Sequence, residues 1–302
     1  MTIKPRALGP GQDIGIIAPA GPVNPDTLRS GIEILIGLGF NPVLGPHLYN
    51  KKGYLAGDDI SRLEDIHEVI GNTEIKAIFC ARGGYGCTRL LEQLDYSLIR
   101  RNPKIIMGYS DISALLISIW GQTGLITFHG PLVTGLKNDS QNNVRHVVDL
   151  LGGESGLSIS MEQAIAFSPG EAEGILVGGN LSLISHLIGT PYLPSLDGNI
   201  LFIEEKGEAP YRLDRMLTHL HQSGMIKNIR GLIIGSLVEC GGMEEIEQVL
   251  NNCLSDLNIP IVYGGPFGHG EENMVLPIGV KAKFDTSEMI LNIIESPVQV
   301  VE

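Results

Sequence analysis

A serine at a turn is the first candidate for chemistry in this 302-residue sequence. Ser110 follows the apolar run KIIM and precedes the helix-like stretch ISALL. A serine between a strand and a helix projects its hydroxyl at the carboxyl end of a sheet, where open α/β folds bind ligands. The first amides of that helix can stabilise an oxyanion. The alternative is a helix N-cap, and Ile112 stands where a Gly-x-Ser-x-Gly elbow has its second glycine.

A glycine-rich turn is the second candidate. The segment ARGGYG, with Arg82, Gly83 and Gly84, also lies between an apolar run and a helical pattern. Glycines let backbone amides approach a ligand closely, which suits half an oxyanion hole or a phosphate cradle. The segment lacks the Gly-Lys-Ser/Thr ending of a Walker A loop and the complete Gly-x-Gly-x-x-Gly pattern. An ordinary tight turn is the alternative.

Acidic side chains and a histidine complete the set. Glu204 and Glu205 end the apolar run NILFI, and His269 lies in the glycine-rich stretch GGPFGHGEEN. Alternation along a strand puts the two glutamates on opposite faces, so at most one points into a given site; a solvated strand end is the alternative. The histidine suits a general base, a metal ligand or a plain loop residue. In nucleophilic catalysis, a base takes the proton of the serine and an acid fixes the tautomer of that base.

The composition excludes several classes of partner. The chain has 21 Lys and Arg against 34 Asp and Glu, a net charge of −13. This balance argues against a nucleic-acid binder and against an anionic membrane surface. The four cysteines form neither a Cys-x-x-Cys pair nor a zinc pattern, and the start of the chain does not have the pattern of a secretion signal. We therefore expect a cytoplasmic protein with idle thiols, no metal and no membrane-spanning segment.

Alternating strands and helices must position these residues. Apolar runs predict strands and periodic stretches predict helices, and their alternation implies a parallel sheet covered on both faces. The main expected strands are DIGIIA, IKAIFC, KIIM, NILFI and GLIIGS. A polar, weakly periodic region interrupts the alternation. We therefore divide the chain into an N-terminal α/β domain (1–136) with the serine, a connection (137–172), and a C-terminal β/α domain (173–302) with the acid and the histidine.

The sequence resembles the LD-carboxypeptidases, a family of serine peptidases that includes murein tetrapeptide carboxypeptidases and microcin C self-immunity proteins. The resemblance spans nearly the whole chain in the expected order. The matching segments are IAPAGP, ARGGYG, IMGYSD, TFHGP, GGNLSLISHLIGTPYLP, ILFIEEKGEAPYRLDRML and GPFGHG.

The resemblance implies a catalytic triad and a two-domain fold. By position, Ser110 is the nucleophile, Glu204 the orienting acid and His269 the base, and the oxyanion hole falls on the backbone amides of Gly84 and Asp111. The implied fold is a Rossmann-like, flavodoxin-like N-terminal domain followed by a swivelling C-terminal β/α domain. Members of the family commonly form homodimers, and neither a metal nor a cofactor is implied.

The implied reaction is hydrolysis of the amide between an L-configured centre and a terminal D-amino acid. In the cell-wall recycling branch, it removes the terminal D-alanine from murein tetrapeptide. Arg82, Lys206 and Arg212 are candidates for binding the substrate carboxylate, although Asp214 makes a structural ion pair an alternative for Arg212.

Other functions stay open at this point. The microcin C branch cleaves peptidyl-adenylates and stacks an aromatic residue on adenine. The only tryptophan, Trp120, lies on an expected helix of the first domain, and residues 180–194 hold none, although Tyr192 is present. These placements favour the murein branch. A non-catalytic ligand-binding α/β protein and an amidotransferase-like hydrolase are the alternatives from other classes.

Overall fold

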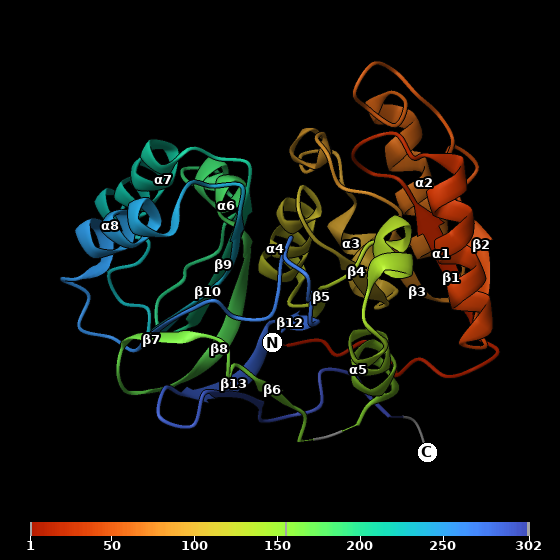
Figure 1. Ribbon diagram of the computed structural model, residues 1–302. Coiled ribbons are helices and arrows are strands. Elements are labelled where there is room, and N and C mark those ends of the chain that lie inside the picture. The colour runs from red at the N-terminus through yellow and green to blue at the C-terminus, as the bar shows by residue number, and fades with distance from the viewer. Residues whose placement is uncertain (1, 155, 301–302) are drawn as a thin grey trace.

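The computed structural model describes residues 2–154 and 156–300 and contains two sheets, each covered by helices (Figure 1). The first sheet has the order β12-β5-β4-β3-β1-β2, and all neighbours are parallel except β12 and β5. The order β2-β1-β3-β4-β5 is that of a flavodoxin-like fold, which confirms the predicted class. The strands are β1 (Asp13–Ile17), β2 (Asn41–Leu44), β3 (Ile75–Cys80), β4 (Ile105–Gly108), β5 (Thr127–His129) and β12 (Leu276–Ile278).

Local sequence explains where the helices of this sheet begin. Asn24 accepts hydrogen bonds from the amides of Asp26 and Thr27, and Pro25 occupies the first helical position of α1. Asp58 and Asp95 accept in the same way at the starts of α2 and α3. The helical elements are α1 (Pro25–Gly37), α2 (Asp59–Gly71), the 3-10 turn η1 (Cys87–Arg89), α3 (Tyr96–Arg101), α4 (Ile112–Thr123) and the 3-10 segment η2 (Val133–Asn138).

The second sheet has the order β6-β14-β13-β8-β9-β10-β11-β7. Its centre, from β8 to β11, is parallel, and antiparallel strands complete both edges. The strands are β6 (Ser158–Ser160), β7 (Ile165–Ser168), β8 (Glu171–Asn180), β9 (Ile200–Lys206), β10 (Gly231–Val238), β11 (Ile261–Tyr263), β13 (Val280–Asp285) and β14 (Ile290–Ile293). The helices of this part are α6 (Leu181–Leu187), α7 (Pro210–Gln222) and α8 (Met243–Leu254). Helix α5 (Gln141–Gly152) lies instead toward the first sheet (Figure 1), where Val144 and Val148 share the lining of a cavity with Ile34 of α1 and with Leu38 at the end of α1.

Both sheets contain strands that come from outside their own domain in the sequence. The expected connection, 137–172, contains α5 and supplies β6 and β7, which form opposite edges of the second sheet. In the other direction, β12 comes from the C-terminal part of the chain and extends the first sheet, where Leu276 pairs with His129. Each sheet is therefore completed by residues that lie far away in the sequence.

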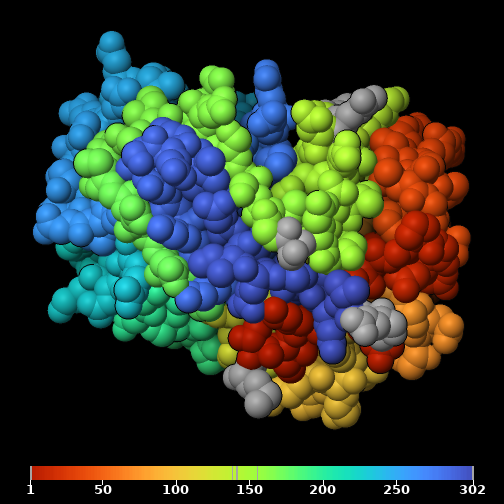
Figure 2. Space-filling view, turned by 90° about the horizontal axis from the view of Figure 1, so that it is seen from below, coloured from red at the N-terminus to blue at the C-terminus, as the bar shows by residue number. Residues whose placement is uncertain are grey.

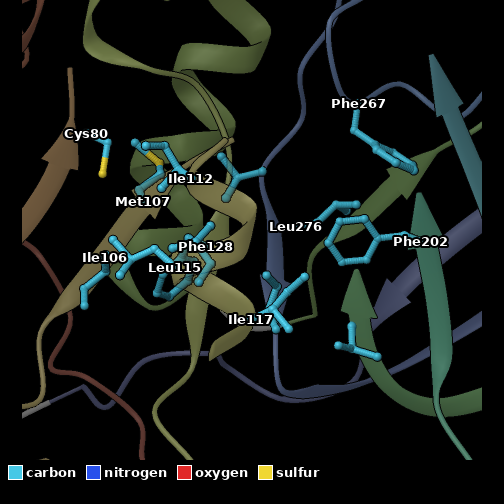
Figure 3. Close-up of a cluster of buried hydrophobic side chains, with 14 of the residues drawn as sticks. Cys80, Ile106, Met107, Ile112, Leu115, Ile117, Phe128, Phe202, Phe267 and Leu276 are labelled. Atoms are coloured by element: carbon cyan, nitrogen blue, oxygen red, sulfur yellow. The ribbon is translucent and has the colours of Figure 1, made fainter. Parts of the chain in front are cut away.

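Helix α4 packs between the two sheets (Figure 3). Its residues from Ile112 to Ile119 are all buried and mostly apolar, as expected of a helix in the interior. Leu115 of α4 lies on the side of β4, and Ile117 lies toward Leu276 of β12 (Figure 3). Gly179 of β8 runs so close to α4 that an added Cβ would lie 2.6 Å from Ser113 Oγ. The two sheets thus share one hydrophobic core.

The two ends of the described chain lie side by side on the underside of the molecule (Figure 2). The amide of Ala7 donates to the carbonyl of Gln299 at 2.9 Å, and the Gln299 amide donates to Pro5 at 2.7 Å. Lys4 and Glu295 form an ion pair at 2.7 Å. Across residues 2–154 and 156–300, we find no helix with the length and apolar character needed to span a bilayer.

Candidate active site

Ser110 occupies a tight turn between β4 and α4. Its φ angle is 65°, in the left-handed region that side chains other than glycine rarely adopt. The N-cap residue of α4 is Asp111, so Ser110 does not serve as the cap. Gly108 leaves room for the turn, because an added Cβ would lie 2.9 Å from Cγ2 of Ile112. Gly108, the first glycine of the Gly-x-Ser-x-Gly pattern, is thus needed for close packing between β4 and α4. Ile112 stands in place of the second glycine.

The glycine-rich turn after β3 packs against Ser110. An added Cβ on Gly83 would lie 3.0 Å from the Ser110 hydroxyl oxygen, so only glycine fits. Gly83 also accepts a hydrogen bond from the amide of Gly21 at 3.0 Å. Gly21 follows β1, so the loops after β1 and β3 meet where the strand order reverses, as ligand-binding loops do in this fold class.

Two buried charged side chains hold the glycine-rich turn in place. The Asp111 carboxylate accepts from the amide of Cys87 at 2.8 Å. The buried Arg62 guanidinium donates to the carbonyl of Pro19 and lies under Gly86, where an added Cβ would be 2.5 Å from Nη1. The Ser110 turn and the glycine-rich turn are therefore fixed to each other rather than independently mobile.

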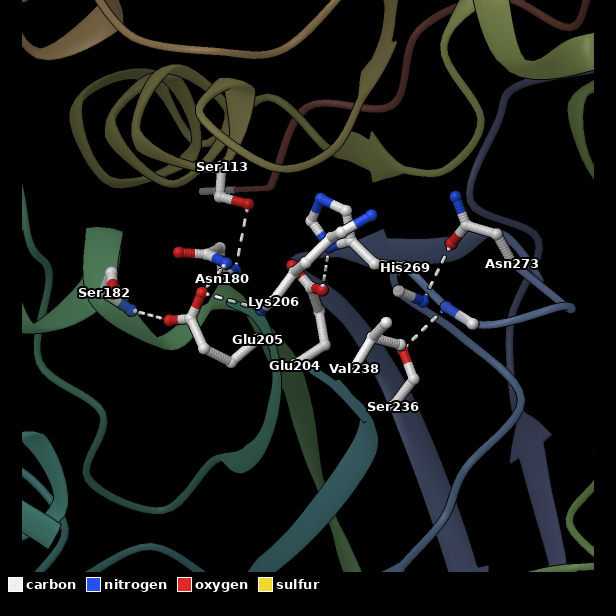
Figure 4. Close-up of polar contacts among 12 residues, drawn as sticks. Ser113, Asn180, Ser182, Glu204, Glu205, Lys206, Ser236, Val238, His269 and Asn273 are labelled. Atoms are coloured by element: carbon white, nitrogen blue, oxygen red, sulfur yellow. Dashed lines mark hydrogen bonds and ion pairs between the residues drawn. The ribbon is translucent and has the colours of Figure 1, made fainter. Parts of the chain in front are cut away.

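Glu204 and His269 form a direct contact (Figure 4). Nδ1 of His269 lies 2.6 Å from Oε2 of Glu204, and the glutamate side chain is completely buried. A carboxylate accepts hydrogen bonds, so the proton of the neutral imidazole is on Nδ1 and Nε2 is the basic nitrogen. Glu204 ends β9, whereas His269 lies on the loop after β11, so the sheet brings the two together.

Glu205 has a different environment (Figure 4). Its carboxylate accepts from Asn180 Nδ2 and from the amide of Ser182, both at 2.8 Å. Burial raises its pKa, although these hydrogen bonds act in the opposite direction. The two glutamates therefore lie on opposite faces of β9, as the alternation predicts, and Glu205 holds the start of α6.

Aromatic rings pack beneath the histidine. The ring of Tyr109 lies 4.7 Å from that of His269 and 5.9 Å from that of His129. His129 in turn packs edge-on against Phe202 at 5.3 Å. Burial, reinforced by the Glu204 carboxylate, raises the pKa of Tyr109 to about 12, so the phenol stays neutral. This stack limits how the His269 ring can turn.

His129 makes the stability of the protein depend on pH. Burial lowers its pKa to about 4, whereas 6.5 is the ordinary value. Between these values the unfolded chain binds more protons than the folded one, so the free energy of unfolding falls as the pH falls. The difference between the two pKa values corresponds to about 3 kcal/mol lost by the time the pH reaches the lower value. Urea denaturation at a series of pH values measures this loss.

The control for this prediction is His129→Phe, which keeps an aromatic ring beside Phe202 and removes the titrating group. Its free energy of unfolding is expected to fall less steeply over the same pH range. Other carboxylates and histidines titrate equally in both proteins. Parallel curves for the two proteins would show that His129 is not the source.

Ser110 follows directly on Tyr109, whose ring packs against His269. No hydrogen bond links the Ser110 hydroxyl to the His269 ring in the described ranges, and such contacts commonly tighten only on substrate binding. A cavity of about 150 Å³ lies beside the histidine loop. Its lining residues are Tyr109, Pro131, Leu132, Gly135, Asp139, Gly268, Gly270, Glu271 and Asn273.

The three candidate cations lie in different settings. Arg82 extends from the glycine-rich turn and donates to the carbonyl of Pro22 at 2.7 Å. Lys206 is half-exposed, and its Nζ lies 3.9 Å from Glu239. Arg212 pairs with Glu208 at 3.0 Å and lines a separate cavity of about 500 Å³.

The sequence did not indicate several residues around this site. Ser236 and Asn273 bind the histidine loop (Figure 4). Asn273 ends the stretch GGPFGHGEEN, whereas no motif marks Ser236. Tyr109 lies inside the motif IMGYSD, so its position next to the serine was the available signal. Within the described part of the chain, no group of three or more His, Cys, Asp or Glu side chains is arranged to hold a metal ion.

Comparisons with known proteins identify the family of the chain. The model of the LD-carboxypeptidase N-terminal domain matches residues 14–130, and that of the C-terminal domain matches residues 173–284. The chain is 39% identical over 298 residues to a probable murein peptide carboxypeptidase of Bacillus subtilis strain 168, covering 95% of this chain and 93% of the relative.

Two solved structures are similar over nearly the whole chain. A MccF-like protein from Bacillus anthracis strain Ames has a TM-score of 0.91 at 28% identity, covering 97% of this chain and all of that one. Muramoyltetrapeptide carboxypeptidase from Oxalobacter formigenes has a TM-score of 0.82 at 29% identity, covering 93% and 97%. The two domain matches and the identity over most of both sequences lead to one conclusion: the chain belongs to the LD-carboxypeptidase family.

Proposed function

We propose that this protein is a serine LD-carboxypeptidase that releases the terminal D-alanine from murein tetrapeptide. The observation that carries the proposal is the 2.6 Å contact between His269 and the buried Glu204, next to the strained turn of Ser110. Such an arrangement has the parts of a nucleophile, a base and an orienting acid. The name of the Bacillus subtilis relative supports a murein peptide as substrate.

The proposed mechanism is acyl transfer through the serine. Nε2 of His269 takes the proton of Ser110 as the hydroxyl oxygen attacks the carbonyl of the L-configured residue. Glu204 holds the protonated ring and stabilises its charge. The tetrahedral intermediate collapses as His269 returns the proton to the leaving amine of D-alanine. Water then hydrolyses the acyl-enzyme by the same base catalysis.

Two backbone amides are proposed to stabilise the oxyanion. They belong to Gly84, on the glycine-rich turn, and to Asp111, which follows the serine. Neither amide donates to another backbone group in the part of the chain that the structure describes, so both donors are available. The bond from Cys87 to the Asp111 carboxylate keeps the two turns together. Preorganised donors of this kind contribute about 3–4 kcal/mol each to transition-state stabilisation in acyl transfer.

A cation is needed for the terminal carboxylate of the substrate, and we propose Arg82 as the first of the three candidates. It lies next to Gly83, which packs against Ser110, and one of its nitrogens is bound to a carbonyl while the others remain as donors. Lys206 is the second candidate because it follows the catalytic strand. Arg212, which is paired with Glu208, is the third.

Hydrolysis of peptidyl-adenylates is the second candidate function. The observation in its favour is the TM-score of 0.91 with the MccF-like structure, against 0.82 with the muramoyltetrapeptide carboxypeptidase. The lack of a tryptophan in residues 180–194 speaks for murein instead. We further propose that the protein acts in the cytoplasm as a homodimer; the four free cysteines fit a reducing compartment.

Mass spectrometry tests the proposed function. Purified protein is incubated with murein tetrapeptide and, separately, with a peptidyl-adenylate analogue. We expect the tetrapeptide to lose one alanine and the analogue to remain intact. Cleavage of the analogue alone would move the protein to the microcin C branch. Cleavage of neither, with binding retained, would favour a non-catalytic ligand-binding protein.

A further inference from the structure

The loop that carries His269 is bound by side chains on both sides of the histidine (Figure 4). The amide of Gly270 donates to the hydroxyl of Ser236 at 2.9 Å. The amide of Gly268 donates to Oδ1 of Asn273 at 3.0 Å. The residues directly before and after His269 therefore each have their own acceptor, and both acceptors belong to side chains rather than to a sheet.

An irregularity in β10 aims Ser236 at this loop. Strand β10 pairs with β9 through Ile234 and Ile203, and again through Leu237 and Glu205, so β10 has one extra residue between the two pairs. An extra residue of this kind bends a strand and redirects its side chains. The irregularity in β10 lies opposite Glu204 of β9. The Ser236 amide also donates to the carbonyl of Phe267 at 3.0 Å. The strand beside the acid thus fixes the loop of the histidine.

Close packing around Gly268 restricts the backbone of the His269 loop. Gly268 has a φ of 102°, and an added Cβ would lie 2.7 Å from Cβ of Glu204 and 2.8 Å from the Ser236 hydroxyl. Asn273 is buried, with 6% of its surface exposed. The backbone before His269 therefore rests directly on the acid and on one of the two acceptors.

From these contacts we infer that Ser236 and Asn273 are positioning residues that hold the His269 ring in line between Glu204 and Ser110. The inference rests on the proposed roles of these three residues. Glu204 binds only Nδ1, which leaves the ring free to tilt about that bond unless the loop backbone is fixed. A displacement of about 1 Å at a reacting group can cost about 100-fold in rate. Loss of either acceptor is therefore expected to slow proton transfer without changing substrate affinity.

A substrate-independent probe tests this inference. Diisopropyl fluorophosphate forms a bond from the Ser110 oxygen to phosphorus, fluoride leaves, and His269 takes the serine proton. Intact-mass spectrometry follows the rate. We expect Ser236→Ala and Asn273→Leu to be labelled about 10- to 100-fold more slowly than the unaltered protein, and Ser236→Thr to restore most of the rate. Wild-type labelling rates for both loss variants would overturn the inference.

Thr286→Val is the matched control. The Thr286 hydroxyl accepts from the amide of Gly170 at 2.9 Å, the same kind of contact as that of Ser236, but directly after β13, three strands away from β10. We expect this variant to lose thermal stability, as Ser236→Ala does, while its labelling rate stays unchanged. An equal loss of labelling in the control would mean that the effect of Ser236→Ala is a general loss of folding.

The probe also separates this inference from the proposed function. If the unaltered protein is labelled but does not cleave murein tetrapeptide, the proposed substrate is wrong and the variants still decide the roles of Ser236 and Asn273. If the unaltered protein is not labelled at all, Ser110 and His269 are not a nucleophile and its base, and the inference falls with them.

Discussion

Replacing Ser110 with glycine is expected to abolish hydrolysis and, at the same time, to make the protein more stable. The hydroxyl is the proposed nucleophile, and its loss is expected to lower kcat/KM by about 10⁴- to 10⁶-fold. The φ of 65° strains any side chain at this position, and glycine adopts it freely. We expect the free energy of unfolding to rise by about 1 kcal/mol, as measured by urea denaturation.

Two controls separate the chemical effect from the backbone effect. Ser110→Ala removes the hydroxyl but keeps a Cβ, so it should be inactive without any gain in stability. Glu239→Gly relieves a second positive φ, of 56°, at an exposed position after β10, and should gain stability while the serine stays in place. Activity retained by Ser110→Gly would exclude the serine as nucleophile. Equal stability of the glycine and alanine variants would show that the turn holds no strain.

Replacing Glu204 with glutamine is the second large effect. A glutamine can place its amide nitrogen toward Nδ1 of His269, which then becomes an acceptor and leaves the proton on Nε2. In that tautomer the ring cannot take the serine proton. A comparable change of an orienting acid costs about 10⁴-fold in kcat, and we expect a similar fall here with little change in KM. Steady-state kinetics with murein tetrapeptide measure both constants.

Glu205→Gln is the matched control for this change. It alters the neighbouring carboxylate, which accepts from Asn180 and Ser182 and makes no contact with His269. We expect this variant to lose stability while keeping most of its kcat. A larger loss of kcat for Glu205→Gln than for Glu204→Gln would reverse the assignment of the orienting acid.

Much of the fold was predictable because apolar runs coincide with buried strands. The strand Ile75–Cys80 has the bounds of the run IKAIFC, and β9 and β10 begin within the runs NILFI and GLIIGS. Their ends are marked by local residues such as glycines, which act without long-range contacts. Prediction was less accurate after the segment ARGGYG, where the expected helical pattern forms only the 3-10 turn η1 (Cys87–Arg89).

The elements that prediction missed depend on distant partners. The helix α5 has five apolar positions within a polar sequence, and the region was interpreted as a connection. The strand β12 is three residues long and exists because it pairs with β5 from the other part of the chain. No local pattern encodes such a pairing.

The sequence predicted which residue types form the candidate site, but not how they are arranged in space. Alternation along β9 placed Glu204 and Glu205 on opposite faces, but only the position of the histidine loop decides which face meets His269. That position depends on the irregularity in β10 and on Asn273. Ser236 has no sequence signal because its role comes from one extra residue in a strand.

The pairing of β12 with β5 also has a consequence during synthesis. Ribosomes release the chain from its N-terminus, so the first sheet lacks its last strand until residues 276–278 have emerged. The proposed base, His269, leaves the ribosome only shortly before that strand. A nascent chain therefore has its serine long before it has its base. Hydrolysis of the proposed substrate therefore becomes possible only after the segment from Glu204 to His269 has also been synthesised.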